Sequence, residues 1–237
     1  MQEAVRRDIL KRVPLFAALR ADTLQRVSQA SATRLVDAGE VVFQEGDASD
    51  FAVVVASGRT KVTVERNAGR PVIVALVDPV TLLGEVALFD RSPRTATLTA
   101  VRPTSLVVVP RQVLLELFFN DREFAQRYTT HLVAVIRRTS EHLAVVATGR
   151  VTTSLAWCLA RLAREAGVPV PGARVLRPAP TRDQLADMIG YTRERTTRAM
   201  TALRADGYVA DVDGGLQVDD RISELLDTDG AGLSASM

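Results

Sequence analysis

The sequence contains a single cysteine, Cys158, and only two histidines among its 237 residues, and both shortages narrow the possible functions. One cysteine excludes an internal disulfide, a cysteine-based zinc site and a four-thiolate iron–sulfur cluster. No apolar run approaches the roughly 20 residues that a membrane-spanning helix requires. Charged residues near the N-terminus leave no legible signal peptide. We therefore expect a cytoplasmic protein that has no contact with a membrane.

The remaining composition is ordinary for a globular protein, since 47% of the residues are hydrophobic and 24% are charged. The length suggests one large domain or two small ones. The net charge of +2 is no evidence for nucleic acid. Lys11 and Lys61 are the only lysines. This preference for arginine reflects either phosphate recognition or the base composition of the genome.

Short runs of β-branched residues occupy residues 35–110 and are separated by turn signals at Gly39, Gly46, Gly58 and residues 67–69. Several short strands at this spacing predict an antiparallel barrel or sandwich. The predicted strands cover residues 41–43, 51–55, 61–64, 72–77, 96–100 and 106–109.

The hydrophobic period changes at Arg111, where a short helix to about residue 118 precedes a longer helix that ends near residue 148. The longer helix has about 26 residues and a length of ~39 Å. Its apolar positions repeat with heptad character, which predicts a symmetric partner helix and hence a homodimer. The alternative is an amphipathic helix that packs on its own barrel. The repeating positions are Phe124, Tyr128, Leu132, Val135, Thr139, Leu143 and Val146.

After Gly149 the predicted elements are a helix, a loop rich in Pro and Gly, two helices separated by a turn, and a hairpin. This order is typical of a winged helix-turn-helix. The elements cover residues 151–166, 168–180, 181–189, 192–205 and 208–218.

We therefore expect an α+β protein with an N-terminal antiparallel β-roll of the jelly-roll kind, a long dimerisation helix and a C-terminal winged helix-turn-helix. The expected domains are residues 1–148, with the dimerisation helix at 122–148, and residues 149–223. Residues 224–237 are expected to form a mobile tail.

The helix-turn-helix segment has clear capping signals. Thr181 and Gln184 form the S/T-x-x-E/Q pattern of a capping box, Gly190 permits a sharp turn, and Thr192 caps the next helix. The first turns of that helix enter the major groove in such folds, where arginine binds guanine and glutamate accepts from cytosine. The alternative is that the glutamate merely pairs with the arginine four residues later. The expected DNA-binding residues are Thr181, Arg182, Thr192, Arg193, Glu194, Arg195 and Arg198.

A second candidate site lies in the β-rich part. Gly84 and Glu85 open a short apolar helical turn, whose backbone N–H groups can face an anion. Arg94 follows nine residues after Glu85, with the hydroxyl of Thr95 beside it. Phosphate donors next to a carboxylate that suits a sugar hydroxyl are what a nucleotide monoester requires.

With these motifs the chain, from about Leu10 to Arg221, resembles the cyclic-AMP receptor protein / fumarate-nitrate regulator (CRP/FNR) family of bacterial transcription factors. The resemblance implies a homodimer that binds palindromic double-stranded DNA with TGTGA-like half-sites and contacts RNA polymerase through the loop at 168–177. The motifs are Gly39-Glu40, Gly46-Asp47, Gly58, Gly84-Glu85, Pro93-Arg94-Thr95-Ala96, Thr181, Gly190, Arg193-Glu194 and Arg198.

The resemblance also implies a cyclic nucleotide as the effector, with cAMP preferred, cGMP as the other candidate, and no metal. Gly84, Glu85, Arg94, Thr95 and Ala96 would form the phosphate-binding cassette. Within it, Arg94 and Thr95 would hold the cyclic phosphate, and Glu85 would bind the ribose 2′-hydroxyl.

Base contacts in the family come from the dimer helix. Thr139 and Ser140 match these positions when the helix is aligned from its N-terminal end. Aligned from its C-terminal end, the helix places Val135 and Ile136 there instead.

Other hypotheses are a regulator of the same fold with an unused pocket, or one that holds haem or a redox group, and a signalling module without a promoter role. We expect no enzyme, because the chain has no cluster of metal ligands, no G-x-S-x-G elbow and no P-loop. His131 and His142 are interpreted as helix-surface or interface residues, and Trp157 and Cys158 as core residues.

Overall fold

The computed structural model describes residues 2–65 and 71–228. The predicted turn at 67–69 and the end of the predicted tail, 229–237, lie outside the described residues. Within these ranges the structure does not describe five side chains, those of Arg138, His142, Val146, Asp227 and Thr228.

The chain divides into two compact units, residues 1–136 and 137–237, and each is described by itself. The division falls inside helix α4 (Arg122–Ala147). The domain boundary expected after residue 148 stays a prediction.

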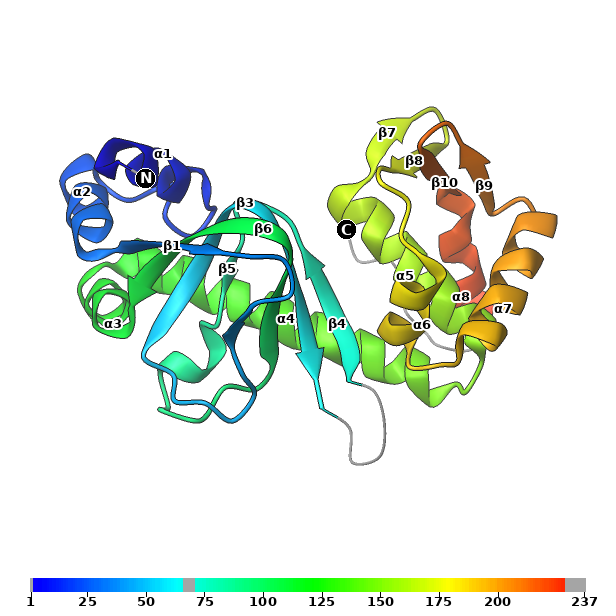
Figure 1. Cartoon of the computed structure of the whole chain (residues 1–237), viewed down its shortest axis with the longest axis horizontal. Helices are drawn as coiled ribbons and strands as arrows, with labels where there is room; N and C mark the ends of the chain where they lie inside the picture. Colours follow the sequence, from blue (N-terminus) through cyan, green and yellow to red (C-terminus); the bar gives the residue numbers. More distant parts are fainter. Residues whose placement is uncertain (1, 66–70, 229–237) are drawn as a thin grey trace. The chain divides into compact units, whose positions relative to one another are not determined.

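The described strands of the first unit are β1 (Ala32–Val36), β2 (Val41–Phe43), β3 (Phe51–Val64), β4 (Val72–Val77), β5 (Leu82–Leu83) and β6 (Thr97–Pro110). They form an antiparallel sheet in the order β1, β6, β3, β4, in which β2 also pairs with β6 and β5 with β3 (Figure 1). The predicted antiparallel β fold is therefore confirmed.

β3 and β6 each merge two of the predicted strands. The turn expected at Gly58 is wrong, because the chain continues through this residue while its pairing register with β6 shifts. Such a shift is the mark of a β-bulge, for which glycine is well suited. Gly58 has a φ of +97°, and Thr104 on β6 fills the space that a Cβ would need.

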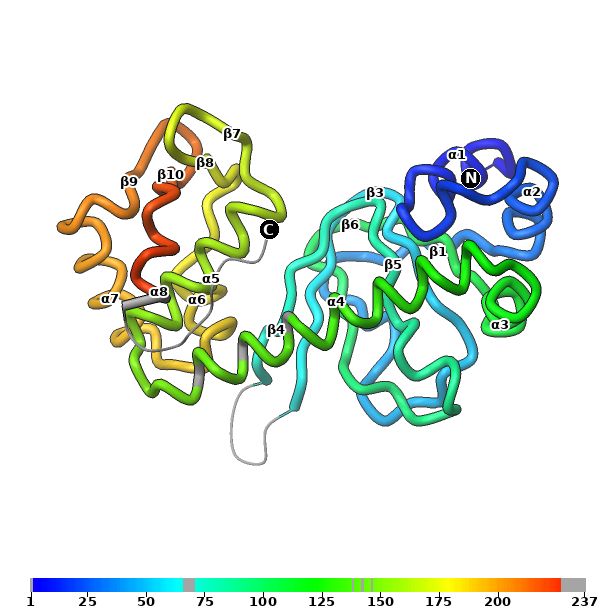
Figure 2. Tube along the Cα trace, turned by 180° about the vertical axis from the view of Figure 1, so that it is seen from behind, coloured from blue at the N-terminus to red at the C-terminus, as the bar shows by residue number. Residues whose placement is uncertain are grey.

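Helices cover one side of this sheet. They are α1 (Glu3–Arg12), α2 (Ala21–Ala30), α3 (Arg111–Asn120) and the first half of α4, with a short 3-10 turn, η1 (Val86–Leu88), after β5. Figure 2 shows the first half of α4 running across the strands. Neither α1 nor α2 was predicted from the sequence. Helix α1 buries only Leu10 and so has a weak apolar stripe, whereas α2 buries Leu24, Val27 and Ser28.

Alternate residues of β3 face two cores, as the two-residue period of a strand requires. Ala52 and Val54 pack into a cluster with side chains of the four helices, among them Phe124. Val53 and Val55 belong to a second cluster, which is made of side chains from the strands themselves. One face of the sheet therefore packs against the helices, including α4, and the other face packs against further strands of the same sheet.

The predicted dimer seam of α4 is wrong over its first half. Phe124 and Tyr128 are fully buried, and Leu132 packs against the same helix-side cluster. This half is an amphipathic helix on its own barrel, which was the alternative, because its apolar stripe completes the core. Among the described side chains of α4, the large apolar ones that are exposed are Val133, Ile136 and Leu143.

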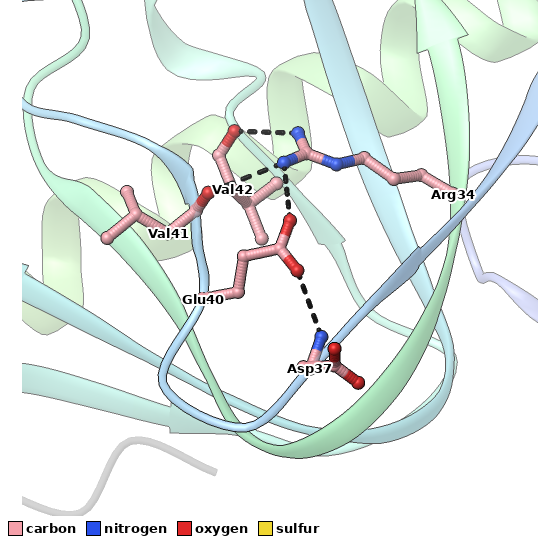
Figure 3. Close-up of polar contacts among 5 residues, drawn as sticks. All are labelled: Arg34, Asp37, Glu40, Val41 and Val42. Carbon is pink, nitrogen blue, oxygen red and sulfur yellow. Dashed lines mark hydrogen bonds and ion pairs between the residues drawn. The ribbon is translucent and has the colours of Figure 1, made fainter.

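Polar contacts close the turn between β1 and β2 (Figure 3). Glu40 accepts from Arg34 Nη2 and from the backbone N–H of Asp37, both at 3.0 Å. Arg34 Nη1 also donates to the carbonyl of Val42 at 3.0 Å. These bonds, first that from Asp37 and then that from Arg34, lower the pKa of Glu40. The Gly39-Glu40 motif therefore has a structural role in this turn.

Val80, between β4 and β5, has a φ of +71°, which is a rare conformation for a β-branched residue. Its N–H donates to the carbonyl of Val55 at 2.7 Å, and the N–H of Val55 donates to the carbonyl of Thr81 at 3.0 Å. These two bonds hold the segment against β3. Val80 also lines a cavity of about 650 Å³ together with Val13, Leu82, Glu123, Arg127 and His131.

After the rest of α4, the described elements of the second unit are α5 (Val151–Ala166), β7 (Val168–Val170), β8 (Ala173–Leu176), α6 (Arg182–Ile189), α7 (Arg193–Ala205), β9 (Val209–Val212), β10 (Gly215–Asp219), η2 (Asp220–Ser223) and α8 (Glu224–Thr228). The strands pair in the antiparallel order β7, β8, β10, β9. Helices α6 and α7 with the β9–β10 hairpin confirm the predicted winged helix-turn-helix.

Two expectations for this unit are corrected. The segment 168–180, expected to be a loop, contains β7 and β8, which pair with each other, and β8 also pairs with β10. The first residues of the expected mobile tail form α8, because Leu226 is buried.

Trp157 and Cys158 are buried core residues of α5, as the sequence predicted. The Sγ atom of Cys158 lies 3.9 Å from the sulfur of Met188. Burial raises the pKa of the Cys158 thiol to about 11. A thiol with so high a pKa is protonated at neutral pH and is poorly reactive.

Candidate functional site

The first candidate site centres on Arg94, a charged residue with only 3% of its surface exposed. Its Nη1 donates to the carbonyl of Gly84 at 2.7 Å, and its Nη2 donates to the carbonyl of Phe51 at 2.5 Å. The guanidinium carbon lies 4.2 Å from the ring centre of Phe43 and 4.8 Å from that of Phe51. Two carbonyl groups and two aromatic rings therefore hold the cation inside the first unit.

Carboxylates act on Arg94, and one of its donors has no partner. Burial lowers the pKa of its guanidinium, while Asp50, Asp47 and Glu85 act in the opposite direction. The Nε atom is buried and has no hydrogen-bond partner. A buried cationic donor without a partner is a position where a phosphate oxygen would complete the hydrogen bonding. The residues present therefore fit a phosphate ligand.

Gly84 makes the position of Arg94 possible. Its φ is +79°, and a Cβ built there would lie 2.6 Å from Arg94 Nη1 and 3.2 Å from the ring of Phe43. Any larger residue would displace the guanidinium and would also strain the backbone. The short helical turn expected after Glu85 is present as η1.

The Gly46-Asp47 motif lies beside the same residue. The backbone N–H of Arg94 donates to the carbonyl of Asp47 at 2.8 Å, and the N–H of Gly46 donates to the carbonyl of Arg94 at 2.9 Å. Two motifs that are far apart in the sequence thus meet at one backbone position.

Glu85 is bound to α4 at two points. Its backbone carbonyl accepts from the hydroxyl of Tyr128 at 2.8 Å, and its Oε1 lies 2.8 Å from Nε2 of His131. Burial, and then the charge of Glu85, raise the pKa of Tyr128. Sequence reasoning interpreted His131 as a helix-surface or interface residue and missed this contact, because a lone histidine 46 residues away carries no pattern.

The other predicted cassette residues are less enclosed. Thr95 is exposed and Ala96 is half-buried. Thr139 and Ser140 are exposed on the part of α4 that belongs to the second unit. Their expected contact with a base stays a prediction.

The second candidate site is built by helix caps in the second unit. Thr181 Oγ1 accepts from the N–H of Gln184 at 3.2 Å, and Gln184 Oε1 accepts from the N–H of Thr181 at 2.9 Å. Gly190 ends α6 with a φ of +71°, and Thr192 Oγ1 accepts from the N–H of Arg195 at 3.4 Å. The predicted capping box, turn and second cap are all present.

One side of α7 is buried and the other is exposed. The side chains that fix the helix to its unit are Thr196, Ala199, Met200 and Leu203. The predicted base-contacting and phosphate-contacting side chains are all exposed: Arg193, Glu194, Arg195 and Arg198. Arg182 differs, because it is half-buried, and burial followed by the charge of Arg204 lowers its pKa.

The exposed side chains of α7 have few contacts within the protein. Arg193 Nε lies 3.5 Å from Asp183, and the guanidinium of Arg195 lies 4.8 Å from the ring centre of Tyr191. In the described part of the chain, Glu194 and Arg198 form no ion pair with each other. Both charges therefore remain available to a partner.

Within residues 2–65 and 71–228, no group of three or more His, Cys, Asp or Glu side chains could hold a metal ion. Nor do these ranges contain a helix that is both long and apolar enough to span a membrane.

Comparison with known proteins gives two family matches. The model of the cyclic nucleotide-binding domain matches residues 33–121, and that of the Crp-like helix-turn-helix domain matches residues 153–222. Together they cover more than half of the chain.

Relatives and solved structures agree with these matches. The chain is 24% identical over 202 residues to a CRP-like cAMP-activated global transcriptional regulator of Mycobacterium tuberculosis, covering 85% of this chain and 90% of that protein. It is 27% identical over 225 residues to the cyclic AMP receptor protein of Thermus thermophilus, and this match covers 95% of this chain and 100% of that protein. The structure of the c-di-GMP responsive global regulator CLP of Xanthomonas campestris has a TM-score of 0.67 at 22% identity, covering 84% of this chain and 99% of that one.

A cyclic nucleotide-binding domain joined to a helix-turn-helix domain defines a class of DNA-binding transcription regulators. Arg94 and Glu85 lie within the first match, and the exposed arginines of α7 lie within the second. The chain belongs to the CRP/FNR family of transcription regulators.

Proposed function

We propose that the protein is a homodimeric regulator whose binding to palindromic promoter DNA is controlled by a cyclic nucleotide in the first unit, with cAMP preferred. The observation that carries this proposal is the buried Arg94, whose Nε atom has no partner. A cation held in this way beside the carboxylate of Glu85 suits a ligand that joins a phosphate to a sugar hydroxyl. The names of the Mycobacterium and Thermus relatives support cAMP as that ligand.

Each cassette residue has a separate role in this proposal. Arg94 and Thr95 hold the cyclic phosphate, and Glu85 accepts from the ribose 2′-hydroxyl. Gly84 and Ala96 let the backbone approach the ligand closely. Thr139 and Ser140 contact the base.

A second copy of the chain is the proposed partner of α4. The exposed Val133, Ile136 and Leu143 follow one another at heptad intervals of three and seven residues. Aliphatic side chains that are 43%, 64% and 70% exposed at this spacing are typical of a coiled-coil seam. The proposed dimer interface therefore keeps Leu143 of the predicted seam, but uses the exposed Val133 and Ile136 in place of the buried first half of that seam.

The dimer would place two copies of α7 on one side of a DNA duplex. Arg193, Glu194 and Arg198 would then read a TGTGA-like half-site, and Arg195 would contact phosphate. Half-site centres would lie about one helical turn, ~34 Å, apart. Thr181, Arg182 and Thr192 would contact the DNA backbone near the helix starts. The protein would act in the cytoplasm together with RNA polymerase, and we propose no enzyme activity for it.

A mobility-shift titration tests this function. Wild type is titrated on a palindrome of TGTGA half-sites and on a scrambled duplex, without nucleotide and with cAMP, cGMP or c-di-GMP. We expect cAMP to strengthen binding to the palindrome and to leave the scrambled duplex unaffected. Arg94→Ala should bind the palindrome as the wild type does without nucleotide.

The other outcomes separate the remaining hypotheses. Equal binding with and without every nucleotide would indicate an unused or differently liganded pocket. A response to c-di-GMP alone would replace the proposed ligand. Nucleotide binding without any DNA binding would favour a signalling module. A monomer in sedimentation at micromolar concentration would contradict the proposed dimer.

A further inference from the structure

The carboxylate that the proposed function assigns to the ribose already has a partner. Oε1 of Glu85 lies 2.8 Å from Nε2 of His131, and the side chains are 7% and 32% exposed. A buried carboxylate oxygen is costly unless a hydrogen-bond donor faces it. His131 supplies that donor from α4, across 46 residues of sequence.

Several other charged or titratable groups surround this pair. On α4, Arg127 forms an ion pair with Glu123 at 3.0 Å, so their charges offset each other. Tyr128 donates to the backbone carbonyl of Glu85 and stays neutral because burial raises its pKa. On the sheet side, Arg94 interacts electrostatically with Glu85 as well as with Asp47 and Asp50. Among all these groups, histidine is the residue type that changes its charge between about pH 5 and 8.

Two consequences follow from protonation of the imidazole. The imidazolium offsets the negative charge of Glu85, which would otherwise repel the phosphate of an incoming nucleotide. It also holds Oε1 in place, so that Oε2 can accept from a sugar hydroxyl. Neutral imidazole keeps at most the second effect, since it carries no charge.

We propose that His131 is a positioning residue for the nucleotide, and that its protonated form strengthens nucleotide binding through Glu85. The inference rests on the proposed function and adds a pH dependence to it. The sign follows from linkage: a ligand that binds more tightly to the protein with a charged imidazole has an affinity that falls as the pH rises over the range where histidine loses its charge. Binding therefore takes up protons in this range.

Calorimetric titration of the full-length protein with cAMP from about pH 5.5 to about pH 8.5 tests the proposal. Four proteins are compared: wild type, His131→Gln, His131→Arg and the control His142→Gln, which replaces the other histidine of the chain. We expect the wild-type affinity to fall about three- to tenfold over this range, the size of one charge–charge interaction in a partly screened site.

The variants separate charge from simple packing. His131→Gln should bind weakly, with an affinity that changes little with pH. His131→Arg should bind at least as tightly as the wild type at low pH and should also lose the pH dependence. His142→Gln should follow the wild type.

The inference and the function fail in different ways. Two results would overturn the role of His131 while leaving nucleotide binding intact. One is a pH dependence of the affinity that persists in His131→Gln, and the other is a pH dependence that is lost in His142→Gln. An affinity of His131→Arg as low as that of His131→Gln would do the same. If the wild type bound no cAMP at any pH, both the role of His131 and the proposed cAMP-dependent function would be contradicted.

Discussion

Arg94 in the first unit and Arg198 in the second are both expected to bind a nucleotide, one a free ligand and the other a base of DNA, yet the protein holds them in opposite ways. Arg94 is 3% exposed, lies against two phenyl rings and donates to two carbonyl groups. Arg198 is exposed and has no hydrogen bond or ion pair in the described part of the chain.

The difference reflects where each site obtains its rigidity. Around Arg94 the guanidinium itself is part of the core, so the phosphate site and the stability of the unit depend on the same bonds. On α7 the rigidity comes from its own cap at Thr192, from the neighbouring helix α6, which Thr181 caps, and from the buried side of α7. The exposed side chains of α7 that are proposed to contact DNA can therefore be substituted without disturbing the fold.

The largest expected effect comes from Arg94→Ala, which removes the shared bonds of the first site. Two half-buried carbonyls would lose a charged donor, at a cost of about 1–3 kcal/mol each in the free energy of unfolding. Urea unfolding measures this loss. The matched control is Arg198→Ala, which should change the free energy of unfolding by about 0.5 kcal/mol or less. Equal destabilisation by both substitutions would remove the contrast between the two sites.

Arg198→Ala should instead reveal itself on DNA. We expect a loss of about 1–3 kcal/mol on the cognate half-site and a relaxed preference for guanine at one position. Binding to a scrambled duplex should hardly change. Fluorescence anisotropy with both duplexes measures the two affinities, and a uniform loss on both would assign Arg198 to the phosphate backbone.

The caps provide a smaller and sharper test of how α7 is supported. Thr181→Ala removes half of the capping box of α6 and should lower the free energy of unfolding of the second unit by about 1 kcal/mol. Thr181→Ser keeps the oxygen and should restore most of it. Thermal unfolding of these two variants is compared with that of Thr201→Ala. Thr201 is exposed in the middle of α7, where alanine should be neutral or slightly stabilising.

The smallest expected effect belongs to Arg195, which stacks on Tyr191. If it contacts phosphate, Arg195→Ala should weaken binding to all sequences similarly and reduce the slope of log affinity against log salt by about one unit. The slope is measured on the cognate and scrambled duplexes. A loss confined to the cognate duplex would show that Arg195 reads a base.

The two sites also differ in how far their sequence predicts them. The caps of α6 and α7 were predicted correctly, because each depends on residues three positions apart, which a linear pattern records. The bonds of Arg94 were not predicted, because its partner Phe51 is 43 residues away and contributes a backbone carbonyl, which no residue type specifies.

Helix α4 shows the same limit in another form. Two apolar stripes with near-heptad spacing run along it, one from Phe124 and Tyr128 and one from Val133 and Ile136, and both reach Leu143. Periodicity alone does not decide which face meets the sheet. The aromatic face does so here because its large side chains complete the core cluster beneath the helix.

Val80 has a consequence for the stability of the connection between β4 and β5. A β-branched residue in the left-handed region carries a backbone strain of about 1–3 kcal/mol. Glycine would adopt the same conformation without that strain, at the cost of about 1 kcal/mol of extra freedom in the unfolded chain. Glycine would also remove the packing of the Val80 side chain against the helix-side core, a loss of about 1–2 kcal/mol. The strain at this connection and the packing of its side chain therefore oppose each other with similar size, which is how a β-branched residue is kept in a conformation that usually belongs to glycine.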